Sequence, residues 1–84
     1  MPVITRFYGI IIKMFFIQRE HQPPHFHAVY GEHNGLFNIE TLEMFEGDLP
    51  DRAERLVREW ALKYQNELRN IWTTQEFTEL PGLD

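Results

Sequence analysis

The chain has 84 residues, with 13 acidic and 8 basic side chains, a net charge of −5 and no cysteine. So short a chain buries too little surface for two cores, and we expect one domain over residues 1–84. The lack of cysteine excludes disulfides, thiolate zinc sites and cysteine nucleophiles, and the acidic balance argues against nucleic acid as a partner.

An apolar run from Gly9 to Ile17 is interrupted by Lys13. The run is well short of the roughly 20 apolar residues that a membrane-spanning helix needs. It also lacks the basic start and the small-residue cleavage site of a secretory signal. We therefore expect a soluble protein of the cytoplasm with no membrane partner.

The first half of the chain has the residue types of β-strands. Residues 10–17 are rich in isoleucine and phenylalanine, which favour a pleated surface. Pro23 and Pro24 cannot donate ladder hydrogen bonds, so residues 18–24 are predicted to connect two strands. Further strands are predicted over residues 25–30, 36–40 and 43–46, so that residues 1–47 are mainly strands.

A hairpin turn is predicted at residues 32–35, because Asn34-Gly35 is a favoured pair for positive φ. The hydrophobic pattern then favours a register with Tyr30 opposite Phe37, which gathers the apolar side chains on one face. In this register His27 lies beside Glu40. We therefore expect His25, His27 and Glu40 on the same side of the sheet.

The second half of the chain has the spacing of one amphipathic helix, predicted over residues 48–76 and followed by an irregular tail over 77–84. The apolar positions recur three and four apart, at Ala53, Leu56, Val57, Trp60, Ala61, Tyr64, Leu68, Ile71 and Trp72. The predicted fold class is α+β, with a small antiparallel sheet of three or four strands packed against one long C-terminal helix.

The predicted helix is longer than the predicted sheet. About 24 helical residues span about 36 Å, whereas strands of six to eight residues span roughly 20–26 Å. Leu68, Ile71 and Trp72 would then overhang the sheet and need another apolar surface. We expect a homodimer to provide it; the alternative is that the first strand and the tail fold back over these residues.

Three histidines, His21, His25 and His27, fall within seven positions around two prolines. Alternate residues of a strand share a face, so His25 and His27 can bind one metal ion such as zinc through their imidazole nitrogens. Glu40, by register, or His21, by proximity, is the candidate third ligand. With three protein ligands, water would take the fourth position and hydrolysis would become possible.

Two other interpretations of the histidines stay open. Imidazole titrates near neutral pH, so the histidines could act as acid and base in metal-free cleavage of RNA, with Arg6, Lys13 or Arg19 holding a phosphate. Alternatively, they hydrogen-bond the loop or contact a partner. The residues that would be catalytic are not defined by the sequence.

Several motifs resemble those of a family of small prokaryotic proteins, the domain of unknown function 4160 family. The similar segments are Met1-Pro2-Val3-Ile4, Arg6-Phe7-Tyr8-Gly9, Pro23-Pro24-His25-Phe26-His27-Ala28, Gly47-Asp48-Leu49-Pro50 and Leu56-Val57-Arg58-Glu59-Trp60. The resemblance implies a compact α+β fold, no established activity, and His21, His25 and His27 as hallmark residues. It also implies a small neighbouring protein as a partner, as in a toxin–antitoxin-like pair.

Two functional hypotheses follow from these observations. The first is a non-enzymatic interaction or regulatory module, homodimeric, with the histidine loop as its contact surface. The second is a metal-dependent or histidine-based hydrolase or ribonuclease that uses His21, His25 and His27.

Overall fold

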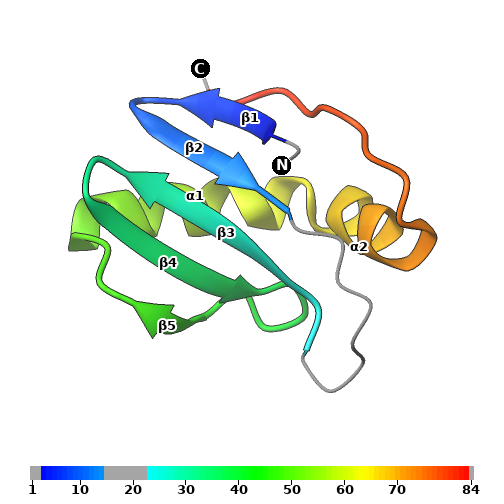
Figure 1. Cartoon of the computed structure of the whole chain (residues 1–84), viewed down its shortest axis with the longest axis horizontal. Coiled ribbons are helices and arrows are strands. Elements are labelled where there is room, and N and C mark those ends of the chain that lie inside the picture. The colour runs from blue at the N-terminus through cyan, green and yellow to red at the C-terminus, as the bar shows by residue number, and fades with distance from the viewer. Residues whose placement is uncertain (1–2, 15–22, 84) are drawn as a thin grey trace.

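Five antiparallel strands form one sheet, in the order in which they occur in the chain, and both helices lie on one of its faces (Figure 1). The computed structural model describes residues 3–14 and 23–83. The elements are β1 (Val3–Phe7), β2 (Ile10–Lys13), β3 (His25–Tyr30), β4 (His33–Asn38), β5 (Met44–Gly47), α1 (Asp51–Lys63) and α2 (Gln65–Thr74). The α+β class is as predicted, but the prediction of three or four strands and one long helix is wrong.

The strand missing from the prediction is β1, which pairs with β2 through a tight turn at Tyr8 and Gly9. Both turn residues have positive φ, 51° and 80°, as a two-residue hairpin with the right-handed twist of its strands requires. An irregularity between Val3 and Thr5 interrupts the alternation of β1. As a result Ile4 and Thr5 are both buried. Residues 15–17 of the strand predicted over 10–17 lie outside the described residues.

The predicted helix over residues 48–76 is two helices, because the backbone leaves helical geometry at Tyr64 (φ −117°, ψ 25°). The side chain of Gln65 donates from Nε2 to the carbonyl oxygen of Ile39 at 2.8 Å, directly after the break. The change of direction lets Leu68 and Ile71 reach the core of their own chain, where they are 0% and 2% exposed. The overhang on which the dimer expectation rested is therefore not present for these two residues.

The tail after α2 returns along the outer edge of β1, as Figure 1 shows. The backbone N–H of Leu80 donates to the carbonyl oxygen of Ile4 at 3.0 Å. The indole Nε1 of Trp60 donates to the carbonyl oxygen of Pro81 at 2.7 Å. Residues 75–83 form neither helix nor strand and are held at both of these points.

The β3–β4 hairpin turns at Gly31 and Glu32, and the prediction of a turn at residues 32–35 is wrong. Tyr30 lies opposite His33 instead of Phe37, a register shift of four residues. Gly35 is a strand residue whose missing side chain makes room for others: a Cβ there would lie 2.8 Å from Sδ of Met44 and 3.1 Å from Leu49. Close packing, and not turn geometry, accounts for glycine at this position.

The core lies between the sheet and the helices and is built around aromatic rings. Trp60 of α1 is fully buried and packs against Phe7 and Phe26, at 5.8 and 5.9 Å between ring centres. Phe26 stacks on Phe37 at 5.3 Å across the β3–β4 pair. Neither helix is long and apolar enough to cross a membrane, within the part of the chain that the structure describes.

Candidate functional site on the outer sheet face

The central strand β3 separates two sets of side chains. Phe26 and Ala28 point to the helices and are fully buried. His25, His27 and Val29 alternate with them and therefore lie on the opposite face. A register shift of four residues is even, so it leaves the side chains within β3 and β4 on their predicted faces. The structure accordingly brings the rings of His25 and His27 to 5.3 Å between their centres.

His25 is fixed in an aromatic setting and is only 3% exposed. Its ring lies 5.3 Å from that of Trp72 and 6.0 Å from that of Phe45, between ring centres. Its Nδ1 is 2.8 Å from the carbonyl oxygen of Pro23. A carbonyl oxygen only accepts, so Nδ1 carries the hydrogen and the lone pair of the neutral ring is on Nε2. Pro23 therefore sets both the orientation and the tautomer of His25.

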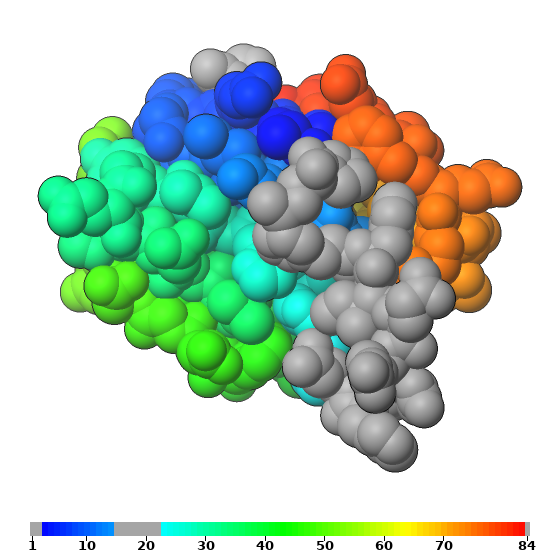
Figure 2. Space-filling model, in the orientation of Figure 1, coloured from blue at the N-terminus to red at the C-terminus, as the bar shows by residue number. Residues whose placement is uncertain are grey.

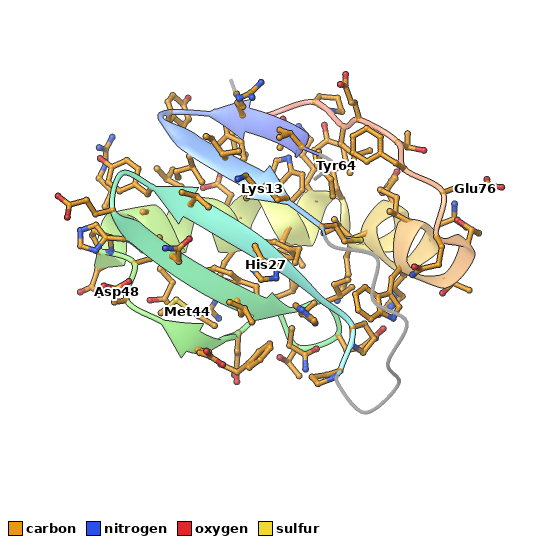
Figure 3. The ribbon with its side chains drawn as sticks, in the orientation of Figure 1. Lys13, His27, Met44, Asp48, Tyr64 and Glu76 are labelled. Carbon is orange, nitrogen blue, oxygen red and sulfur yellow. The ribbon has the colours of Figure 1, made fainter. Side chains whose placement is uncertain are left out.

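His27 occupies the middle of the same face and is half-buried. Its strand neighbours are Lys13 on β2 and Leu36 on β4, and Figure 3 shows Lys13 and His27 on adjoining strands. Burial, and then the charges of His25 and Lys13, lower the pKa of His27 to about 4. The imidazole is therefore uncharged at neutral pH.

Glu40 does not lie opposite His27, and this part of the predicted register is wrong, since Leu36 takes that place. The carboxylate of Glu40 instead accepts from Nε of Arg69 on α2, with both oxygens at 3.0 Å. Within residues 3–14 and 23–83 there is no group of three or more histidine, aspartate or glutamate side chains that could hold a metal ion. His21, the other candidate third ligand, lies outside the described residues.

His33, at the start of β4, faces a carboxylate. Its Nδ1 lies 3.3 Å from Oδ2 of Asp48, and both side chains are exposed to solvent over much of their surface. The backbone N–H of Asn34, and then His33, lower the pKa of the Asp48 carboxyl. This pair joins the β3–β4 turn to the end of β5 and is separate from the His25–His27 pair.

The outer sheet face also carries apolar residues that sequence reasoning did not single out. Ile11, Val29 and Leu36 alternate with core residues and remain partly exposed, and Phe45 is 48% exposed. The outer sheet face is the side of the five strands turned away from the helices, and Figure 2 views the molecule from this side. We define this face by the following residues: Arg6, Ile11, Lys13, His25, His27, Val29, Leu36, Phe45 and Glu46. The sequence does contain a signal for an apolar outer face. Ala28 and Val29 are consecutive apolar residues of β3, whereas a strand with one face in water alternates apolar and polar residues.

The model of a protein family, the domain of unknown function DUF4160, matches residues 9–73. The chain belongs to the DUF4160 family. The DUF4160 region runs from the β1–β2 turn into α2, so it contains both histidines and every outer-face residue except Arg6. Strand β1 and the tail that pairs with it lie outside the DUF4160 region. No curated protein matches the chain, and no solved structure matches it.

Proposed function

We propose that the protein is an interaction module that binds another protein chain through the outer sheet face. The observation that carries this proposal is Phe45, a phenyl ring 48% exposed beside the buried ring of His25. An antiparallel sheet that faces water on one side normally shows polar residues there. A contiguous apolar patch on such a face marks a contact site.

The arrangement of the outer sheet face is that of an interface with an apolar centre and a charged rim. Ile11, Val29 and Leu36 lie on the three middle strands, whereas Arg6 and Glu46 lie on the two edge strands. Lys13 is the last residue of β2, and Phe45 adds an apolar ring at the β5 edge. His27, in the centre, is uncharged at neutral pH because its pKa is about 4. A partner that covers this centre would therefore not bury a charge on the imidazole.

Site-specific photo-crosslinking in cells that produce the protein tests this proposal. A photoreactive amino acid replaces Phe45 or Leu36, and in the control it replaces Leu62, which is 68% exposed on α1, the helix on the other side of the sheet. We expect discrete crosslinked species from the two outer-face positions and none from Leu62. The proposal would be contradicted if none of the three positions gave a crosslinked species, or if Leu62 crosslinked as strongly as the two outer-face positions.

A second candidate function is metal binding by His25 and His27, with hydrolysis as a possible consequence. Two imidazoles on one tetrahedral ion, with metal–nitrogen distances of about 2.0–2.1 Å, place their ring centres about 5 Å apart. The observed separation is 5.3 Å. A metal-binding histidine commonly donates its other ring N–H to a backbone carbonyl, as His25 does to Pro23.

Elemental analysis of the untagged protein, purified without added metal or chelator, tests the second candidate. About one divalent ion per chain, lost in the His25→Ala, His27→Ala double variant while the circular dichroism spectrum persists, would support it. Glu40→Gln is the matched control, because Glu40 is engaged by Arg69. No metal in the wild type, and no uptake from added zinc, would reject it.

A further inference from the structure

Charge is divided unevenly across the outer sheet face. The basic side chains, Arg6 and Lys13, lie on β1 and β2, whereas the acidic side chain of the face, Glu46, lies on β5. Asp48, just beyond the end of β5 and outside the face as defined, adds a second carboxylate at that edge. Among the ion pairs within residues 3–14 and 23–83, none involves Arg6, Lys13 or Glu46. One half of the face is therefore basic, the other half acidic, and three of these charges have no ionic partner among the described side chains.

The order of the strands makes this division self-complementary. Strand β3 is the middle strand of the sheet. When two copies stack face to face about a two-fold axis parallel to β3, the β1–β2 half of each copy lies over the β4–β5 half of the other. Basic side chains then meet acidic ones on both sides of the axis. A two-fold axis across the strands would place β1 over β1 and bring like charges together.

One row of side chains shows the contacts that this stacking makes. Lys13, His27, Leu36 and Glu46 lie side by side on β2, β3, β4 and β5. In the stacked pair, Lys13 lies over Leu36 of the other copy and is offset sideways from Glu46 of that copy by one strand spacing, about 4.8 Å. The long side chains of Lys13 and Glu46 can reach each other across the gap between the two sheets. The two His27 rings meet at the axis. The low pKa of His27 means that these rings do not repel each other at neutral pH.

We propose that the occupant of the outer sheet face is a second copy of this chain, stacked about an axis parallel to β3. The proposal rests on the interaction function given above and names its partner. Five strands with about five residues each make a face of roughly 24 by 17 Å. Interfaces of this small size belong to weak and transient complexes, so the dimer is expected to dissociate in the micromolar range.

Analytical ultracentrifugation of the full chain, from about 1 μM to about 500 μM, measures the dissociation constant of the dimer. We expect Lys13→Glu and Glu46→Lys each to raise this constant at least tenfold. An equimolar mixture of the two variants should restore the wild-type value, because both Lys13–Glu46 contacts become attractive again in the mixed dimer. Lys63→Glu, on the exposed side of α1, is the control and should leave the constant unchanged. Circular dichroism checks that each variant is folded.

Three results would overturn the proposal. These are a wild type that stays monomeric over the whole range, a mixture that does not recover the dimer, and a dimer that Lys63→Glu weakens as much as Lys13→Glu does. The crosslinking experiment separates this failure from that of the interaction function. If the protein is monomeric in the ultracentrifuge but position 45 crosslinks to a different protein, then the partner is not a second copy, and the interaction function still stands. A monomer without crosslinks rejects both.

Discussion

Trp60 and Pro81 are joined by a hydrogen bond of 2.7 Å from the indole Nε1 to the carbonyl oxygen. The bond connects the last turn of α1, at a fully buried position, to the C-terminal tail. The same indole contacts Phe7 of β1 and Phe26 of β3 through its ring. Trp60 is thus in contact with the helix layer, the sheet and the tail together.

Replacement of this residue tests how strongly the tail is held. Trp60→Phe keeps an aromatic ring but removes the hydrogen bond and leaves a cavity. We expect a loss of about 2 kcal/mol in the free energy of unfolding, measured by urea denaturation. In the variant, the amide proton of Leu80, which is bonded to Ile4, should also exchange faster with solvent. Unchanged exchange at Leu80 would show that the tail does not depend on Trp60.

Gly35 should tolerate a methyl group poorly, because a Cβ there would lie 2.8 Å from Sδ of Met44 and 3.1 Å from Leu49. We expect Gly35→Ala to cost about 1–3 kcal/mol of stability through overpacking. In a protein that already carries Met44→Ala, Gly35→Ala should cost less stability than it does in the wild type, because the clash with Sδ has been removed. Thermal unfolding of the four proteins measures the coupling, and strict additivity would contradict the packing explanation.

The pKa of His27 predicts how stability depends on pH. The ring titrates near 6.5 in the unfolded chain and at about 4 in the folded protein. Between these values the unfolded state binds more protons, so acidification favours unfolding. The His27 contribution to stability is therefore complete above pH 6.5 and is lost as the pH falls toward 4. For a partly exposed ring we expect about 1 kcal/mol.

His27→Gln isolates this contribution from that of the carboxylates. Its free energy of unfolding should fall less than that of the wild type between pH 6.5 and 4, and should run parallel to it above pH 7. Titration of the His27 ring by NMR gives the pKa directly. A midpoint near 6.5 would contradict the expectation.

The Glu40–Arg69 pair is expected to contribute little to stability, although Nε of Arg69 lies 3.0 Å from both carboxylate oxygens. The side chains are 49% and 44% exposed, so water and salt screen their attraction. A double-mutant cycle with Glu40→Gln and Arg69→Met should give a coupling energy of about 0.5 kcal/mol that decreases in 0.5 M salt. A coupling above about 2 kcal/mol would show that the pair is better shielded than its exposure indicates.

The faces of the strands could be predicted from the sequence, but the register could not. Alternation alone places Phe26 and Ala28 on one side and His25 and His27 on the other, and the structure agrees. The register depended on the choice between Gly31 and Asn34-Gly35 as the turn. Gly35 is needed because Met44 and Leu49 pack against it, and that requirement is visible only after β5 has been placed. The prediction that Glu40 lies beside His27 depends entirely on taking Asn34-Gly35 as the turn.

The division of the helix could not be predicted from local sequence either. Apolar residues continue at helical spacing through Tyr64, without glycine or proline near it. The feature beside the break is tertiary, a hydrogen bond from Gln65 to the carbonyl oxygen of Ile39, at the end of the sheet. Strand β1 could have been found, because Thr5 and Phe7 precede a Tyr8-Gly9 turn that leads into an isoleucine-rich strand.

The bond between Leu80 and Ile4 has a consequence for how the protein behaves after damage. An uncovered strand at the margin of a sheet is a template on which other chains add and aggregate. The tail covers part of the exposed edge of β1. The other edge strand, β5, is protected against pairing with other chains because it is only four residues long and carries the charged Glu46. A protease that clipped the chain between α2 and Leu80 would leave the core residues in place but would release the cover of β1. The cut protein would then be lost first through precipitation and not through unfolding.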